Sequence, residues 1–405
     1  MKNNTLIVNN NIQTKHSERI FSTQLSKKFE KIYLNIKEEI KNPKKTLNVL
    51  NKDFRFNFKL KELKKFKKFK TLALVGMGGS ILGSEAIHNL FYKKIKKKVY
   101  FFDSLEESKI LDLRRKENPS KVLFLIISKS GNTIETLSNT FFLNIIKKNS
   151  KNVIVISEKK NNFLYTLSKK FNLFFIEHNS SIGGRYSVLS EVGIIPAYLM
   201  GINIFKFRSQ ILDCLSLRNK NFLKESTIKL ASLIKSKKFN NLIFLNYSPA
   251  LEKFLYWCQQ MIAESLGKKN LGFLPVISNA PKDHHSLLQL YLDGPKDKIF
   301  NIFSLKSKFN ETINTTKLIK EKNFLNKKKL DEIKNAQKNA LIKILFKKST
   351  PFREFKIIKT NEEVLGRLFS YFMIETVIVG RLLGIDPFNQ PAVEQIKIYT
   401  KQLLK

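Results

Sequence analysis

The sequence predicts an α/β protein built around parallel β-sheets. Short, uninterrupted apolar runs of strand length alternate with longer segments whose apolar residues recur at helical spacing, as in βαβ units. Two of the apolar runs are followed at once by a glycine-containing turn and a helix start. The chain has 405 residues, of which 42% are hydrophobic, so it can bury a sizeable core. This length corresponds to two or three domains of about 150 residues each.

The first half of the chain carries the clearest pattern. Thr71–Val75 is expected to form a strand, Gly76–Gly79 a turn and Ser80–Phe91 a helix. A second turn, Lys129–Asn132, leads into a helix from about Thr133. Four further strands are expected at Val99–Asp103, Lys121–Ser128, Val153–Ser157 and Leu173–Glu177. Together these elements predict a doubly wound domain of standard size.

The second half repeats this pattern less regularly. Asn241–Asn246 is expected to be a strand leading into a helix over Pro249–Leu266. Two more strands are expected, at Lys298–Leu305 and Phe355–Ile358. Further helices are expected at Val188–Gly201, Phe222–Lys235, His284–Leu292, Lys328–Leu345, Glu362–Leu383 and from Pro391, where proline suits a first helical turn.

These elements predict four parts of the chain. A helical N-terminal arm covers 1–50, a first α/β domain 51–205, a second 206–360, and C-terminal helices that complete the functional site 361–405. Within Lys61–Lys70, apolar residues recur every third position, which fits either a helix on a membrane surface or a surface helix with one face in the core. The second interpretation is favoured, because such amphipathic stripes usually face a core.

Composition excludes several classes of protein. The only cysteines, Cys214 and Cys258, cannot build a disulfide framework or a multi-cysteine zinc site, and a reducing compartment is expected. The longest apolar runs, such as Val122–Ile127, are far shorter than the ~18 residues of a membrane span. The N-terminus has no apolar stretch long enough for a signal peptide. We therefore expect a cytoplasmic protein without a membrane role.

The net charge of +41 is unusual, and such a field attracts nucleic acids, anionic membranes or anionic metabolites. Only ten of the 74 basic residues are arginines, and the lysines accompany abundant Asn, Ile and Phe, whose codons are rich in A and T. A dedicated DNA-binding protein would use arginine more, since its fork matches guanine and phosphate. We interpret the charge as compositional bias and expect no specific nucleic-acid partner.

The loop Gly76–Ser80 follows a strand and opens a helix, a position where free backbone N–H groups can hold an anion. It is not a dinucleotide-binding motif, because Ile81 stands where the third glycine would be. It is not a Walker loop either, because Ser84 occupies the lysine position. A tight turn without a ligand remains an equal alternative.

The loop Ser128–Thr133 repeats this arrangement at another strand end. It adds the hydroxyls of Ser128, Ser130 and Thr133 and the ammonium of Lys129 at a helix start. Such groups can surround a phosphate monoester. An ordinary N-cap is the alternative, but a cap needs one hydroxyl, so phosphate binding is favoured.

Three further segments carry chemically active side chains. Gly184 and Arg185 follow one another before an apolar helix. This pattern favours a backbone held close to a ligand, with the guanidinium directed at that ligand. The alternative is a surface arginine after a turn. Glu264 ends an apolar helix, where an exposed glutamate is the commoner arrangement and a partly desolvated general base the alternative. His284 and His285 point to different faces and form a poor chelating pair, and no HxxxH spacing exists, so no metal is expected.

Taken together, these segments resemble the phosphoglucose isomerase family in its short bacterial form. The resemblance runs from Thr71 to the C-terminus and rests on blocks in the family's order: GMGGSILG, SKSGNTIET, GGRYSVLSEVGIIPAYLMGI, AESLGK with DHHSLLQLYLDGP, and PFNQPAVEQIK. It implies two sugar-isomerase (SIS) domains, each a flavodoxin-like three-layer αβα sandwich, in a homodimer. It also implies interconversion of glucose 6-phosphate and fructose 6-phosphate, in glycolysis and gluconeogenesis, without a cofactor.

The resemblance also implies roles for individual residues. Glu264 matches the base that moves a proton between C1 and C2, and Gly184 and Arg185 match groups that face the enediolate. His285 matches the ring-opening histidine, which enters the partner subunit's site. The remaining matches are Ser80, Ser128, Lys129, Ser130 and Thr133 with the phosphate binders, Lys397 with a lysine near the ring oxygen, and Gln390 with a sugar contact. Ile396 departs from the family pattern, in which many members have glycine there.

Three alternatives remain open at the level of sequence. A dual phosphoglucose and phosphomannose isomerase would also turn over mannose 6-phosphate. A non-catalytic sugar-phosphate sensor would not need Glu264, His285 and Lys397 together, and usually carries a helix-turn-helix domain that 1–50 does not resemble. A basic nucleic-acid-binding protein would explain the charge alone.

Overall fold

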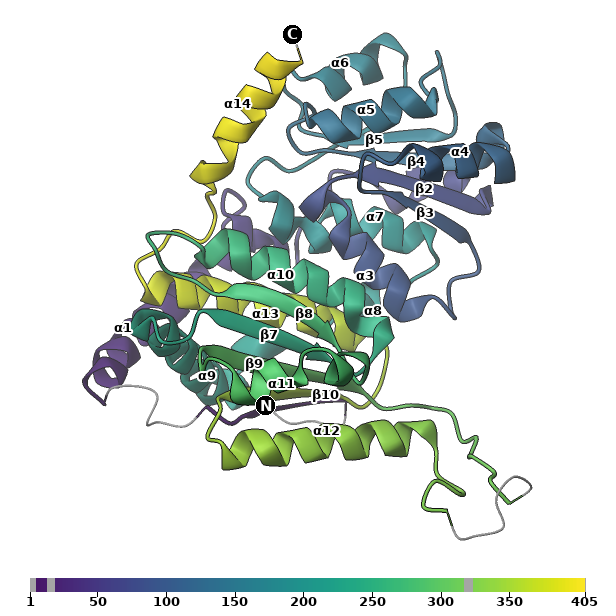
Figure 1. The fold of residues 1–405 in the computed structure, drawn as a ribbon. Coiled ribbons are helices and arrows are strands. Elements are labelled where there is room, and N and C mark those ends of the chain that lie inside the picture. The colour runs from purple at the N-terminus through teal and green to yellow at the C-terminus, as the bar shows by residue number, and fades with distance from the viewer. Residues whose placement is uncertain (1–4, 13–18, 317–322, 405) are drawn as a thin grey trace.

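The computed structural model describes residues 5–12, 19–316 and 323–404. Within these ranges the chain forms two five-stranded sheets, and helices cover both faces of each sheet (Figure 1). The predicted α/β class and the two-sheet architecture are confirmed. No helix in this part of the chain is long and apolar enough to cross a bilayer.

The first sheet is entirely parallel, in the order β3-β2-β4-β5-β6. Its strands are β2 (Thr71–Gly76), β3 (Lys98–Phe102), β4 (Val122–Ile127), β5 (Val153–Ser157) and β6 (Phe174–Glu177), so every strand predicted in this half is present. This is the flavodoxin-like order 2-1-3-4-5. The direction of winding reverses between β2 and β4, which are adjacent, and such a switch point is where doubly wound sheets bind ligands.

The central strand β4 shows why this sheet forms. All six of its residues are buried, as expected for an apolar strand covered on both faces. Its alternate side chains enter two different clusters: Leu123 and Leu125 join the large core that spans both sheets, whereas Phe124 and Ile126 join a smaller core on the outer face. Helices on both faces of the sheet are therefore required by the sequence of this strand.

The second sheet has the order β1-β10-β9-β7-β8, parallel except where β1 pairs antiparallel with β10. Its strands are β1 (Leu6–Asn10), β7 (Asn241–Asn246), β8 (Leu274–Asn279), β9 (Lys298–Leu305) and β10 (Phe352–Ile357). The sequence analysis did not predict β1 or β8. Both are short edge strands. The apolar run of β1 is only three residues long, and β8 contains a proline, which is tolerated at an edge.

The terminal segments contain the predicted helices and one additional strand. Although 1–50 was expected to be a helical arm, its described part supplies edge strand β1 as well as helix α1 (Arg19–Lys41). Helix α13 (Glu362–Leu382), expected among the C-terminal helices, is buried along almost its whole length. The last helix, α14 (Glu394–Leu403), has no buried residue and projects from the body of the molecule (Figure 1).

The lysine-rich stretch before β2 forms α2 (Leu60–Leu63) and a 3-10 helix (Lys64–Lys68). Leu63 and Phe66 are buried in the core while the lysines are exposed, so the favoured interpretation of a core-facing surface segment is confirmed. The other helices of the first sheet are α3 (Leu82–Phe91), α4 (Glu107–Lys116), α5 (Ile134–Leu143), α6 (Phe163–Lys170), α7 (Glu191–Leu199) and α8 (Ile204–Arg208). Those of the second sheet are α9 (Leu217–Ser236), α10 (Glu252–Leu266), α11 (Leu288–Asp293) and α12 (Leu330–Lys347).

Helices α3 and α10 pack against each other between the two sheets (Figure 1). Each follows a strand at the switch point of its own sheet: α3 follows β2, and α10 follows β7. This contact brings groups from the two halves of the chain together.

Candidate active site

Two predicted loops meet at the switch point of the first sheet. Gly76 at the end of β2 lies opposite Ile127 at the end of β4, so the loops that follow these strands, Gly76–Ser80 and Ser128–Thr133, leave the same edge of the sheet side by side. Open α/β sheets bind their ligands at this edge.

The glycines of the first loop permit close packing. Gly78 has a left-handed φ of 51°, and a Cβ atom there would lie 2.6 Å from Nε2 of Gln260 on α10. A Cβ atom on Gly79 would lie 2.3 Å from the carbonyl oxygen of Gly184. The loop is therefore in tight contact with both the helix that carries Glu264 and the segment that carries Arg185. Ser80 ends this loop and is partly buried.

The second loop gathers three hydroxyls. The Oγ1 atom of Thr133 lies 2.9 Å from Ser128 Oγ and 3.5 Å from Ser130 Oγ. Thr133 is the N-cap residue of α5, yet its side chain makes no capping hydrogen bond. The hydroxyls are thus not consumed as a cap, and they stand beside a positively polarised helix end. This arrangement favours anion binding over the alternative of an ordinary cap.

Lys129 faces away from these hydroxyls. Its Nζ donates to the carbonyl oxygen of Ser180 at 2.9 Å and lies 3.7 Å from Oε1 of Glu158. Burial lowers the pKa of the Lys129 ammonium. In this structure the residue therefore contributes its backbone to the loop, while its charge lies against the neighbouring segment.

Arg185 is the centre of a buried polar cluster. Its side chain is only 3% exposed, and all five guanidinium N–H groups have acceptors. Nε donates to Ser265 Oγ (2.8 Å), Nη1 to Glu264 Oε2 (3.1 Å) and Gln390 Oε1 (2.8 Å), and Nη2 to the carbonyl oxygens of Pro387 (2.6 Å) and Asn389 (3.2 Å). A guanidinium held at every donor has a fixed position and direction.

Glu264 lies at the accessible side of this cluster, near the end of α10. Its side chain is 29% exposed, so its carboxylate is held by the protein and still reachable from solvent. Oε2 accepts from Arg185, and Oε1 accepts from Gln260 Nε2 at 2.8 Å. The sequence alone favoured a free, exposed helix-end glutamate, whereas the structure shows an oriented one.

The structure thus brings together four of the predicted site residues from three distant segments: Gly184, Arg185, Glu264 and Gln390. Sequence reasoning missed the groups that hold them, notably Gln260, Ser265 and the carbonyls of 387 and 389. Gln260 had a usable signal, since a glutamine four residues before a glutamate lies on the same helix face. The two carbonyls had none, because backbone oxygens leave no mark in a sequence.

His285 does not join this cluster. It ends a 3-10 turn (Lys282–His285) that Asp283 anchors, accepting from Ser278 Oγ at 2.9 Å and from the Asn279 backbone N–H at 2.7 Å. His284 points back into the protein, with Nε2 2.8 Å from Tyr247 Oη. The side chain of His285 is exposed and makes no hydrogen bond with any described residue. Within the described ranges, no three His, Cys, Asp or Glu side chains converge as a metal site would require.

Lys397 is also outside the cluster. It lies on the projecting helix α14, where its Nζ donates to Glu394 Oε1 at 2.7 Å, one turn earlier on the same helix. Both side chains are more than half exposed. Gln390, by contrast, lies just before this helix and contacts Arg185. The chain therefore turns away from the cluster between residues 390 and 397.

Comparison with known proteins shows the family to which the chain belongs. Residues 27–281 match the sequence model of the phosphoglucose isomerase family. The chain is 31% identical to a glucose-6-phosphate isomerase of Methanocaldococcus jannaschii, over 93% of this chain and 94% of the relative. A hypothetical protein of Thermus thermophilus has a similar crystal structure, with a TM-score of 0.81, 23% identity, and 98% and 99% of the two chains covered. The structure of a glucose-6-phosphate isomerase from Chlamydia trachomatis matches with a TM-score of 0.69 at 18% identity, covering 85% of this chain and 72% of that one.

Proposed function

Because this chain belongs to the phosphoglucose isomerase family and interconverts glucose 6-phosphate and fructose 6-phosphate, we propose that Glu264 carries the proton between C1 and C2 of the sugar. The observation that supports this role most directly is the Glu264–Arg185 contact at 3.1 Å, which joins a reachable carboxylate to a fixed cation. An aldose–ketose isomerase needs both groups at the reacting carbons.

The proposed step balances without an external reactant. The Glu264 carboxylate takes the proton from C2 of open-chain glucose 6-phosphate, and the C–H electron pair forms a double bond between C1 and C2. The carbonyl oxygen on C1 thereby becomes an enediolate oxygen. Glu264 then returns the proton to C1, while the C2 hydroxyl gives its proton to the C1 oxygen and becomes the new carbonyl. General base and acid catalysis of this kind contributes about 10²–10⁴-fold.

Arg185 stabilises the enediolate in this proposal. One Nη1 proton is directed at Glu264 and the other at Gln390, so both point to the side where the sugar would lie. A positive charge fixed before the reaction stabilises the developing oxyanion without reorganisation. The backbone of Gly184 and the side chain of Gln390 complete this wall of the site.

The phosphate group is assigned to the paired loops of the first sheet. The hydroxyls of Ser80, Ser128, Ser130 and Thr133, with the uncapped start of α5, provide donors at its carboxyl edge. Lys129 would have to leave Ser180 to reach the phosphate with its ammonium. Binding energy from this remote group positions the reacting carbons.

We further propose that the enzyme works as a cytoplasmic homodimer. His285 is exposed and apart from Glu264, which suits a residue that opens the sugar ring in the partner subunit's site. Cys214 and Cys258 are both buried free thiols, in keeping with a reducing compartment. Lys397 is assigned to the ring oxygen, and this role requires α14 to approach the cluster from its present position.

The decisive variant is Glu264→Gln, which keeps the shape of the side chain but cannot accept a proton at neutral pH. Gln260 can compensate by turning its amide, because its Oε1 is buried without a hydrogen bond and can accept from the new amide group. We expect isomerisation and deuterium incorporation from solvent, followed by NMR, to fall by about 10²–10⁴-fold.

A matched control separates this loss from a loss of binding or folding. Glu225→Gln changes an exposed glutamate on α9 that pairs with Lys229, and it should keep full activity. Fructose 6-phosphate should still bind to Glu264→Gln in calorimetry. Wild-type deuterium incorporation in that variant would remove Glu264 from the mechanism.

A further inference from the structure

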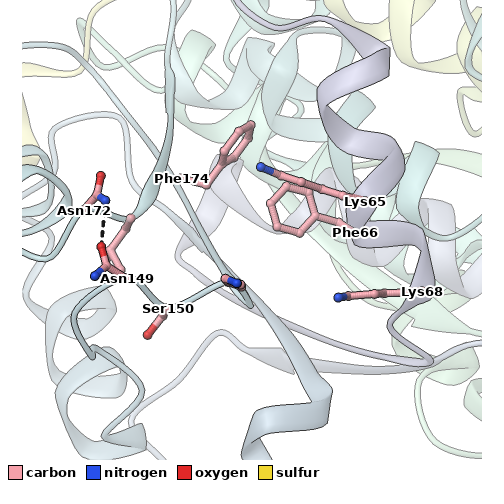
Figure 2. Close-up of a pocket in the computed structure, with 9 residues that line it drawn as sticks. Lys65, Phe66, Lys68, Asn149, Ser150, Asn172 and Phe174 are labelled. Carbon is pink, nitrogen blue, oxygen red and sulfur yellow. Dashed lines mark hydrogen bonds between the residues drawn. The ribbon is translucent and has the colours of Figure 1, made fainter.

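A cavity lies away from the candidate active site. It has a volume of about 600 Å³ and opens between the lysine-rich segment before β2 and the loops that precede β5 and β6 (Figure 2). Lys65 and Lys68 extend into it from one side, and Asn149, Ser150 and Asn172 form the other side (Figure 2). Its size is that of a small-molecule site.

The position of this cavity separates it from the sugar-phosphate site. The segments that line it all precede strands of the first sheet, so it lies at the amino edge of the sheet. The loops of the candidate active site follow β2 and β4 at the carboxyl edge. The six residues of β2 place these two edges about 20 Å apart.

The cavity is positively charged without compensation. Three of its nine lining residues are lysines, Lys65, Lys68 and Lys151, and none of the nine is acidic. All three lysines are exposed, and none forms an ion pair with a described carboxylate. Lysines elsewhere on the surface commonly do, as in the pair Lys41–Glu38 at 2.9 Å. A local excess of ammonium groups around a hollow concentrates anions there.

The walls are ordered rather than loose. Phe66 and Phe174 pack edge to face with their ring centroids 5.0 Å apart, and the Lys65 ammonium lies 4.5 Å from the Phe174 centroid. Asn172 Nδ2 donates to Asn149 Oδ1 at 2.7 Å, which ties together the two loops that face the lysines (Figure 2). The lysines therefore project from a fixed frame that spans three segments of the chain.

We propose that this cavity is a second anion site, which binds a small molecule carrying two or more linked phosphate groups. Three ammonium groups from two segments can contact separate phosphates, and lysine binds phosphate as a compact point charge. A single phosphate would leave much of the charge unmatched. The limited volume of the hollow, about 600 Å³, favours a small oligophosphate over a polymer that needs an extended groove. The proposal does not depend on the catalytic roles assigned to the other edge.

Inorganic tripolyphosphate is a suitable probe. Calorimetric titration is carried out with the full chain in a saturating equilibrium mixture of glucose 6-phosphate and fructose 6-phosphate, which keeps the isomerase site occupied. We expect one tripolyphosphate to bind per chain. In the triple variant Lys65→Gln/Lys68→Gln/Lys151→Gln, the dissociation constant should rise by at least about tenfold, because the ammonium contacts are lost.

The matched control removes the same net charge elsewhere. Lys343, Lys347 and Lys356 are exposed on α12 and β10 and form no ion pair with a described carboxylate. Changing these three to glutamine should alter the dissociation constant by less than about twofold, because exposed charges far from the site are screened. Isomerase activity and the melting temperature should stay unchanged in both triple variants.

Three results would overturn the proposal. Tripolyphosphate could fail to bind the wild type once sugar phosphates are present. The two triple variants could lose affinity equally, which would show a response to net charge only. Finally, a short oligothymidylate could bind more tightly than tripolyphosphate with the same dependence on Lys65, Lys68 and Lys151, which would assign the surface to nucleic acid.

Discussion

The residues of the Arg185 cluster are held by many hydrogen bonds, whereas His285 and Lys397 are exposed. The family resemblance nevertheless assigns all of these residues to one active site. In the cluster, every guanidinium donor has an acceptor, and the groups come from α10, from the segment around Gly184 and from residues 387–390. His285 and Lys397 are exposed, and neither contacts the cluster.

The contrast separates two kinds of proposed catalytic group. The groups proposed to transfer the proton are held together within one chain, where α10 packs against α3 and the segment around Gly184. The side chain of His285, which is proposed to open the sugar ring, makes no hydrogen bond with a described residue. Such a side chain could be oriented by contacts with a second subunit, and a two-fold dimer would provide that subunit.

Mixing two inactive variants tests this contrast most strongly. Glu264→Gln and His285→Ala homodimers should each lose about 10²–10⁴-fold of their activity, because each lacks an acid–base group. Co-refolding them in equal amounts makes about half of the dimers mixed. In each mixed dimer one site carries both changes and the other carries neither. Activity should therefore return to roughly a quarter of the wild-type value, measured in a coupled assay for glucose 6-phosphate.

The opposite result is equally informative. If both residues served the same chain's site, every site in the mixture would carry one change, and activity would stay at the level of the parents. Mass spectrometry of the intact dimers verifies that mixed pairs have formed. If verified mixed dimers stay inactive, His285 is assigned to the active site of its own chain. The membership of the isomerase family would not be affected.

The cluster itself can be broken by a change that keeps the charge. Lysine in place of Arg185 provides one compact ammonium instead of a planar fork, so it cannot meet Ser265, Glu264, Gln390 and two carbonyls together. We expect Arg185→Lys to lower kcat/KM by about 10²–10³-fold. The control is Arg218→Lys, at an exposed arginine paired with Asp213, which should change kcat/KM by less than about twofold. A near-normal Arg185→Lys enzyme would mean that charge alone is sufficient.

The fold was predictable where strands are central and uniformly apolar. The uninterrupted apolar run Val122–Ile127 predicts a strand covered on both faces, and the structure has a fully buried strand there. The edge strand β8, with burial that varies along its length, and the five-residue β1 could not be identified in this way. The pairing of β1 with β10 joins residues more than 340 positions apart, which no local pattern encodes.

The candidate site was predictable in its side chains and not in their support. Hydroxyl-rich and glycine-rich turns after apolar strands pointed to Ser128 and Gly79. The sequence could not show that Lys129 turns toward Ser180, or that a carbonyl of Pro387 holds Arg185, because these contacts arise only when the segments pack. The role assigned to each of the site residues, from Glu264 and Arg185 to Lys129, His285 and Lys397, stays a prediction.

A buried pair of titratable groups supports the segment that leads to Arg185. His178 follows β6 and Glu191 begins α7, and both are fully buried. Glu191 Oε1 accepts from the Asn179 backbone N–H at 2.7 Å, and His178 Nδ1 lies 2.9 Å from the Asn179 carbonyl oxygen. Burial raises the pKa of Glu191 to about 7 and lowers the pKa of His178 to about 4. Near pH 6 both are therefore neutral, and their 3.8 Å contact is not an ion pair.

The smallest effect on turnover, and a clear one on stability, is expected from Glu191→Gln. The Glu191 pKa is raised from 4.5 to about 7 in the folded protein, so the folded state binds more protons than the unfolded state between these values. Wild-type stability at this site is thus greatest below about pH 4.5 and declines as pH rises to 7, by on the order of 3 kcal/mol. Glutamine keeps the acceptor for Asn179 and never ionises, so this decline disappears.

The melting temperature of the variant should match that of the wild type near pH 5 and exceed it by several degrees at pH 8, while kcat stays within about twofold. His178 is common to both proteins and cancels in the difference. A variant less stable than the wild type at pH 8 would show instead that a charged Glu191 is held by a protonated His178, and that this support of the Arg185 segment is ionic.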